Sequence, residues 1–458
     1  MPPSRNRRSR AGEVDANTSR VTQILWHTCL VKNSQPKESW IGLSFEVVIE
    51  KVAHGGIFVA RHEGRVVFVN HVLPGEKVKV RVYEDRGKGF CRAEPIKLIE
   101  TSPDRVDHVW PDAAAASLGG PGAGGAEFGH IKLERQRELK ADVLEEALQR
   151  MAGITLRPTV EAAPGDDEAN GLGYRTRVQL HVNDFGDVGP YRERTHEVVK
   201  VGALPLAAED IQDLEMHNRN YQGVSKIEVA ASSTGQTMIK VDSKLNSTER
   251  LVERAGGRTF RVSPGGFWQV HKRAPEVLTS AVNGMVAAVG IDKDAENLDL
   301  YGGVGLFAGA LAAKFGKDLR ITTVEAYKQA TEDATLNLND LPRVKAVCQA
   351  TERFLNERAA EAKAEAKKAK ADGLAEPKST ATIVLDPPRS GAGAHVIERL
   401  VQIAPKHIVY VACDPVALAR DLKELLASGY ELQALRAFDL FPHTHHVESV
   451  ASLVRKDA

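Results

Sequence analysis

The last third of the chain alternates between short apolar runs and longer segments with helical spacing. Residues 297–301, 320–324, 382–385 and 409–412 are rich in aliphatic and β-branched side chains, and helix-like stretches separate them. Strands that alternate with helices in this way are typical of a parallel sheet covered by helices on both faces. We therefore predict an α/β fold, a Rossmann-like doubly wound sheet, over residues 286–458.

A different pattern precedes this domain. Apolar and polar residues alternate over residues 44–50, 65–69 and 77–82, and glycine- and proline-containing turns bound these short segments. Short strands with such turns indicate a small β-barrel, which we place at residues 41–101.

Basic side chains gather around the last predicted hairpin of this barrel. They are Lys77, Lys79, Arg81, Arg86, Lys88 and Arg92. Such a cluster suits the phosphates of a nucleic acid, and it is equally typical of an ordinary solvated surface. Composition alone does not decide between these two interpretations.

The other segments are assigned by composition. Residues 1–40 lack periodicity and predict a disordered tail, and residues 102–130 contain an Ala- and Gly-rich linker. Residues 131–285 mix strands and helices and predict a central α+β module. Residues 356–378 form an Ala/Lys/Glu tract without an apolar stripe, which predicts a solvated helical insertion in the sheet domain.

Charge and cysteine content exclude several classes of protein. Lys plus Arg (61) equals Asp plus Glu (61), so the overall charge does not indicate a nucleic-acid partner. The four cysteines are widely scattered, which fits a reducing cytoplasm better than a disulfide framework. No apolar run approaches the roughly 20 residues of a membrane span, and no signal peptide is recognisable.

A glycine-rich turn follows the first strand of the predicted sheet. Gly303 and Gly305 lie between that strand and a helix, where glycine lets the backbone approach a ligand at the helix N-terminus. Glu325 ends the next strand, 20 residues after Gly305, which suits hydrogen bonds to ribose hydroxyls. Residues 303–308 also satisfy the dinucleotide fingerprint, so this spacing leaves NAD open as the cofactor.

Polar residues end further strands of the sheet. Asp386 and Cys413, like Glu325, directly follow apolar runs, and ligands of doubly wound sheets bind at the carboxyl ends of the strands. Residues 432–438 and 447–454 predict a terminal hairpin whose antiparallel last strand brings Glu448 to the same edge. A thiol and a carboxylate placed there can act as nucleophile and base.

Taken singly, these residues have ordinary structural explanations. A lone cysteine at a strand end is usually a small buried hydrophobe, and Glu448 alone is typical of a surface charge. The histidines at 443, 445 and 446 share one tight turn without further ligands, so we predict no metal site. The joint order of the motifs favours a functional site.

These motifs together resemble the RNA uridine-5 methyltransferases, a class I family dependent on S-adenosylmethionine (SAM). The resemblance rests on residues 299–305 (Asp-x-Tyr-x-Gly-x-Gly), 263–269 (Ser-Pro-Gly-Gly-Phe-Trp-Gln), 386–389 (Asp-Pro-Pro-Arg), 413–415 (Cys-Asp-Pro) and 441–448 (Phe-Pro-x-Thr-x-His-Val-Glu). The barrel resembles the TRAM domain, an RNA-binding module common in this family. The match covers most of the chain from about residue 40 onward.

The resemblance implies roles for particular residues. SAM is expected to contact Gln269, Tyr301, Glu325 and Asp386 together with the glycine turn. Cys413 is expected to add to carbon 6 of a uracil in transfer or ribosomal RNA, and Glu448 to remove the hydrogen on carbon 5. The uracil must leave the stack of neighbouring nucleobases before Cys413 can reach it. A uridine in a loop, or one that is flipped out of a helix, is therefore the expected substrate.

The chain departs from the family pattern at two places. Leu306 stands where family members often place a cofactor-contacting Asn, so only its backbone is available for contact. Many members hold an iron–sulfur cluster through four cysteines, most of them just after the barrel. Here residues 109–111 and the Gly- and Ala-rich stretch that follows contain no cysteine, and Leu204 stands at the expected fourth position. We therefore predict no iron–sulfur cluster.

Three alternatives remain open at this stage. An NAD-dependent oxidoreductase explains the glycine turn but has no use for Cys413 with Glu448. A non-catalytic RNA-binding protein would keep the fold without the chemistry. Cytosine methylation also uses a cysteine, although the Cys-Asp-Pro order matches the uridine family. No protein partner and no membrane association are expected.

Overall fold

The computed structural model describes residues 39–87, 89–242, 244–374 and 379–456. The predicted tail therefore lies almost wholly outside the described residues. None of the helices in this described part is long and apolar enough to cross a membrane.

The N-terminal barrel predicted from the alternating pattern is present and closed. Its strands follow the spatial order β1-β2-β3-β5-β4. They are β1 (Ser44–Ala53), β2 (Ile57–His62), β3 (Arg65–Val69), β4 (Lys77–Asp85) and β5 (Phe90–Glu100). Alternate residues such as Val78, Val80 and Val82 point inward and are buried, as period-two patterning requires.

The middle of the chain is built from short elements around a five-stranded sheet of order β11-β10-β9-β7-β8. Its helices are α1 (Leu133–Ala147), α2 (Glu209–Gln212) and the short turns η1 (Pro111–Ala113), η2 (Ala116–Leu118), η3 (Leu148–Ala152) and η4 (Met216–Asn218). Its strands are β6 (Val160–Ala162), β7 (Arg177–Val182), β8 (Val188–Gly189), β9 (Lys226–Ala231), β10 (Thr237–Val241), β11 (Lys244–Leu245), β12 (Leu251–Ala255) and β13 (Arg258–Val262). The last two pair as a separate hairpin.

The doubly wound sheet is confirmed, with eight strands in the order β16-β15-β14-β17-β18-β20-β19-β6. Besides β6, its strands are β14 (Asn297–Leu300), β15 (Ile321–Glu325), β16 (Val344–Cys348), β17 (Thr382–Leu385), β18 (His407–Ala412), β19 (Tyr430–Asp439) and β20 (Glu448–Arg455). The helices are α3 (Ala274–Val289), α4 (Leu306–Phe315), α5 (Lys328–Asn337), α6 (Thr351–Ala371), α7 (Gly393–Ile403) and α8 (Pro415–Ala427).

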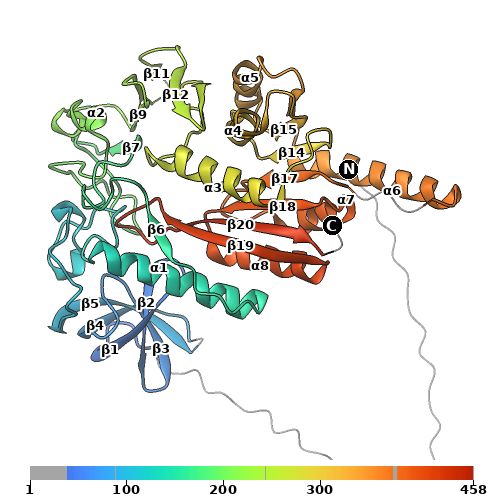
Figure 1. Ribbon diagram of the computed structural model, residues 1–458. Coiled ribbons are helices and arrows are strands. Elements are labelled where there is room, and N and C mark those ends of the chain that lie inside the picture. The colour runs from blue at the N-terminus through green and yellow to red at the C-terminus, as the bar shows by residue number, and fades with distance from the viewer. Residues whose placement is uncertain (1–38, 88, 243, 375–378, 457–458) are drawn as a thin grey trace, which may run out of the picture. The chain divides into compact units, whose positions relative to one another are not determined.

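Helices cover both faces of this sheet, as Figure 1 shows for α3 and α8 on opposite sides of β18 and β20. Every residue of β17 and β18 is buried, because a central parallel strand has an apolar layer on each side. The end of the chain forms the predicted hairpin, since β20 pairs antiparallel with both β18 and β19. In α6, the buried residues all lie at or before Ala359.

Two elements that precede the predicted sheet domain also join its core. Strand β6 pairs in parallel with the end of β19 and forms one edge of the sheet. Helix α1 packs Leu144 into the sheet core and Leu139 into the barrel core. The boundaries drawn from sequence remain predictions, but α1 and β6 are physically part of the sheet's packing.

A buried ion pair ties α1 to the end of β19. Lys140 Nζ lies 2.5 Å from Asp439 Oδ1, and neither side chain is more than 1% exposed. Lys140 also donates to the carbonyl oxygen of Phe441 at 3.1 Å. Burial lowers the pKa of Lys140, while the Asp439 carboxylate opposes that shift.

Breaking this pair should destabilise the protein strongly. We expect Asp439→Asn to cost about 3–5 kcal/mol, because it leaves a buried ammonium uncompensated. The double variant Lys140→Met with Asp439→Leu should lose less than Asp439→Asn alone. Urea unfolding monitored by circular dichroism measures both losses.

A surface pair joining the same strand to β6 provides the control. Arg436 and Glu161 lie 2.7 Å apart but are 45% and 40% exposed, so Glu161→Gln should cost less than about 1 kcal/mol. Equal losses for Asp439→Asn and Glu161→Gln would show that the buried pair is not a major constraint.

Candidate active site

Cys413 and Glu448 lie at the neighbouring ends of β18 and β20, each one residue beyond the pairing of these two strands. The last paired residues of β18 and β20 are Ala412 and Ser449, so Cys413 follows one and Glu448 precedes the other. Glu448 is buried and Cys413 is partly buried. The antiparallel return of β20 therefore produces the juxtaposition expected from the sequence.

Asp386 belongs to the same group. It directly follows β17, and its backbone N–H donates to the carbonyl oxygen of Leu300 on β14 at 3.3 Å. Burial raises the pKa of Asp386 to about 7, and the nearby Asp299 carboxylate adds to this rise. Burial also raises the pKa of Glu448 well above its ordinary value, with a further contribution from Asp386.

The Cys413 thiol shares this environment. Burial, together with the Glu448 and Asp386 carboxylates, raises its pKa to about 12, whereas Arg389 opposes the rise. Arg389 likewise opposes the rise at Glu448. A thiol with this pKa is protonated at neutral pH, so attack by the thiolate requires deprotonation when substrate binds.

A cavity of about 200 Å³ opens in front of Cys413. Its lining includes Arg389, His446, Lys140 from α1, and His54 and Gly56 from the turn between β1 and β2. Arg389 Nη2 lies 3.3 Å from His446 Nε2. The barrel therefore supplies part of the wall around the nucleophile.

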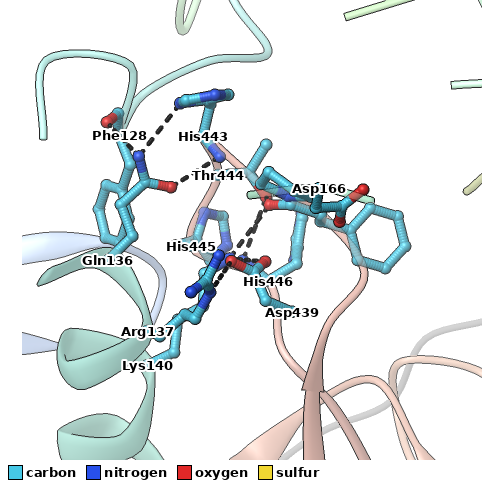
Figure 2. A network of polar contacts seen from close by, with 12 residues as sticks. Phe128, Gln136, Arg137, Lys140, Asp166, Asp439, His443, Thr444, His445 and His446 are labelled. Carbon is cyan, nitrogen blue, oxygen red and sulfur yellow. Dashed lines mark hydrogen bonds and ion pairs between the residues drawn. The ribbon is translucent and has the colours of Figure 1, made fainter. Parts of the chain in front are cut away.

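Polar contacts hold residues 441–446, the turn that precedes Glu448. Gln136 on α1 accepts the backbone N–H of His443 at 2.7 Å, and its amide nitrogen lies 3.1 Å from His443 Nδ1 (Figure 2). His445 binds the Glu127 carboxylate through both its ring and its backbone N–H. The segment 102–130, interpreted from sequence as a linker, thus contributes Glu127 as a partly buried anchor of this turn.

The glycine turn and Glu325 contact each other directly. The backbone N–H of Gly303 donates to Glu325 Oε2 at 3.1 Å. Gly305 has φ +87°, and a Cβ there would lie 2.7 Å from Leu338 Cδ1. A Cβ at Gly303 would meet nothing within 4 Å, so the backbone of the turn borders open space.

Tyr301 leads into this turn with a positive φ of 59°. Its side chain is partly buried, and burial raises its pKa to about 12. Beneath the turn, Asp299 accepts the N–H of Ala308 and the hydroxyl of Thr323, each at 3.1 Å. These bonds tie β14 to α4 and β15, and burial raises the pKa of Asp299 to about 7.

Gln269 is brought towards the same turn by its neighbour. Trp268 packs in one apolar cluster with Val304 and Leu306. The side chain of Leu306 is buried in that cluster, which leaves its backbone to face the turn. The open space at Gly303, the start of α4 and the Glu325 carboxylate fit the methionine and ribose parts of SAM.

The basic residues predicted on the barrel have acidic neighbours. Each of the following pairs lies within 4 Å: Lys77 with Glu46, Arg81 with Glu94, Arg86 with Glu84, and Arg92 with Glu84. Lys79 alternates with Lys77 and Arg81 along β4, and Lys88 lies outside the described residues. An RNA-binding role for these cations stays a prediction.

The described cysteines do not assemble a cluster site. Cys91 is buried in the barrel core, Cys348 ends β16, and Cys413 lies at the end of β18. Trp110 and Leu204 occupy an apolar cluster of the middle segment, where the expected cysteines are missing. This donor set does not fit an iron–sulfur centre.

The sequence interpretation missed several residues of the site. Arg389 directly follows Asp-Pro-Pro and belongs to that motif, although the resemblance assigns it no function. His54, Glu127 and Lys140 carry no local signal, because each reaches the site from an element hundreds of residues away in sequence.

Comparison with known proteins agrees with this geometry. A model of the family described as tRNA (uracil-5-)-methyltransferase matches residues 209–456, and a TRAM domain model matches residues 39–96. An uncharacterised RNA methyltransferase of Streptomyces avermitilis is 39% identical over 453 residues, which cover 90% of this chain and 98% of the relative. One from Streptomyces coelicolor is 38% identical over 455 residues, covering 91% of this chain and 93% of the relative.

A solved structure shares the fold. The crystal structure of Pyrococcus abyssi tRNA (uracil-54, C5)-methyltransferase in complex with S-adenosyl-L-homocysteine superposes with a TM-score of 0.64. The match covers 90% of this chain and all of that chain at 20% identity. At this identity, the likeness concerns the arrangement of elements.

The raised pKa of Asp386 predicts a pH dependence of stability. Between about pH 4 and pH 7, the folded protein keeps the proton on Asp386, whereas the unfolded chain has released it. The stability of the folded protein should therefore fall as pH rises through this window. Asp386→Asn removes this ionisation and should flatten the decline, measured by urea unfolding from pH 4 to pH 8. Glu249→Gln, at an exposed position, is the control. Parallel curves for wild type and Asp386→Asn would contradict the assignment.

Proposed function

Since this chain belongs to the tRNA (uracil-5-)-methyltransferase family and is a SAM-dependent RNA methyltransferase, we propose that it methylates carbon 5 of a uridine through a covalent adduct with Cys413. The observation that carries this proposal is the meeting of Cys413 with Glu448 at the end of paired strands β18 and β20. Family membership favours SAM over NAD as the cofactor.

Cys413 acts first in this mechanism. Its thiolate forms a bond from Sγ to carbon 6 of the uracil, and the electron pair of the double bond makes carbon 5 enolate-like. When bound, SAM supplies the methyl group that carbon 5 accepts. Arg389 is the cation that lowers the pKa of the thiol, and we assign it the stabilisation of the thiolate.

Glu448 completes the reaction. Its carboxylate takes the proton from carbon 5, the double bond re-forms, and the bond between Sγ and carbon 6 breaks to release Cys413. Burial makes this carboxyl a stronger base once it is ionised, because its pKa is raised. Gln269, Tyr301, Gly303, Gly305, Glu325 and Asp386 are proposed to hold SAM.

The substrate is proposed to be a uridine of transfer or ribosomal RNA. The TRAM match supports RNA binding by the barrel. The family model and the Pyrococcus neighbour are both named for tRNA, which makes transfer RNA the first substrate to test.

Labelled SAM and RNA from cells lacking the gene test the reaction. We expect label in 5-methyluridine with wild type and none with Cys413→Ala. Cys348→Ala changes an exposed cysteine elsewhere on the sheet and should retain activity. Label in another nucleoside would overturn the uridine assignment, and absence of label despite RNA binding would favour a non-catalytic RNA-binding protein.

Glu448→Gln tests the second half of the mechanism. Loss of the base should reduce turnover by about 10²–10⁴-fold, because proton removal is what frees the enzyme. The RNA should then remain covalently attached, visible as a band shift in a denaturing gel. The shift should disappear in Cys413→Ala with Glu448→Gln. Slow turnover without a trapped adduct would contradict the role of Glu448.

A further inference from the structure

The turn between β1 and β2 of the barrel lies against the catalytic cavity. His54, Gly55 and Gly56 line the cavity together with Cys413. A Cβ on Gly56 would lie only 2.6 Å from Cβ of His445, and Gly56 has φ +72°. Glycine is therefore required for this close approach.

His54 contacts the residue that follows the nucleophile. Its Nε2 lies 2.8 Å from Asp414 Oδ2, while Asp414 Oδ1 accepts the backbone N–H of Ala417 at 2.8 Å. Asp414 is thus the N-cap of α8 and the anchor of His54 at once. The carboxylate fixes the orientation of the imidazole ring.

The contact between His54 and Asp414 affects the pKa values of both side chains. The hydrogen bond with Asp414 raises the pKa of His54, and that bond also helps to hold the pKa of Asp414 below its ordinary value. His54 remains 50% exposed, and among the described residues no partner is found for its Nδ1. When the ring is protonated, Nδ1–H is a second donor that an anionic ligand can accept.

The titratable side chains of the surrounding wall are mostly basic. Besides His54, the cavity is lined by Lys140, Arg389, His445 and His446, and Asp414 is the one acidic residue in that lining. Lys140 and His445 already bind Asp439 and Glu127. His54 and Arg389 are the exposed basic side chains of this lining beside Cys413.

We propose that His54 binds a backbone phosphate of the RNA next to the uridine that enters the cavity. The inference rests on the proposed function, in which a flipped uracil reaches Cys413. A flipped base carries its phosphates to the mouth of the pocket, where the half-exposed imidazole lies. The barrel thereby contacts the same nucleotide that the sheet domain modifies.

RNA binding and methylation by His54 variants test the assignment. The probe is total RNA from cells lacking the gene, bound to the full-length protein over a range of NaCl concentrations. We expect His54→Ala to weaken binding about tenfold, as for loss of one charge-assisted hydrogen bond. The slope of log affinity against log salt should become shallower by about 0.7–0.9, the value for one phosphate contact. His54→Lys should restore most of both effects.

A second barrel variant separates phosphate binding from docking of the barrel. Lys51 on β1 pairs with Glu146 on α1 at 2.7 Å and does not line the cavity. Lys51→Ala should therefore leave the salt slope unchanged. In methylation assays, His54→Ala should raise KM for RNA more than it lowers kcat.

Each outcome bears on one proposal. An unchanged affinity and salt slope in His54→Ala would overturn the phosphate contact, whether or not the protein methylates RNA. Failure of His54→Lys to restore binding would also overturn it, because a purely structural role explains that result. If wild type makes no 5-methyluridine but the His54 effects on binding appear, the phosphate contact stands and the proposed reaction falls.

Discussion

The buried contact between Lys140 and Asp439 is the constraint on which the site depends. An ammonium and a carboxylate that are almost fully buried are tolerated only together, so α1 and the end of β19 are fixed to each other. One turn away on α1, Gln136 binds both the backbone and the ring of His443. The turn that leads into Glu448 is therefore positioned from α1 and not by the sheet alone.

The same helix joins the two halves of the cavity. Leu139 packs among barrel residues and Leu144 among residues of the sheet. With α1 held by its buried charge, the turn between β1 and β2 can approach His445 closely enough to require Gly56. Packing of this kind transmits small shifts, because protein interiors leave few voids to absorb them. The barrel and the sheet domain therefore both line the cavity at Cys413, in addition to being joined in sequence.

Sequence patterns predict the site wherever its geometry follows from local periodicity. Cys413 and Asp386 follow fully buried strands, and Glu448 begins the antiparallel strand that returns beside β18. These placements need only strand direction and the rule that ligands bind at carboxyl ends. The predicted sheet and barrel follow from the same short-range alternation.

The remaining contacts depend on long-range packing that leaves no local pattern. His54 meets Asp414 across 360 positions, and Glu127 meets His445 across 318. Glu127 lies in a segment whose Ala- and Gly-rich composition is typical of a linker. Strand β6 has only three residues, too few for a periodic signal, yet it completes the edge of the sheet. The pKa values of Asp386 and Cys413 likewise arise from burial that composition does not reveal.

The separation of Lys140 and Asp439 by 299 positions also has a consequence during protein synthesis. A ribosome translates α1 long before β19 and β20, so Lys140 and Gln136 initially have no native partners. The barrel can fold from its own contiguous strands, whereas the wall around Cys413 must wait for the final hairpin. The nascent chain can thus gain its N-terminal barrel before it gains a reactive centre, and assembly of the cavity becomes one of the last events of folding.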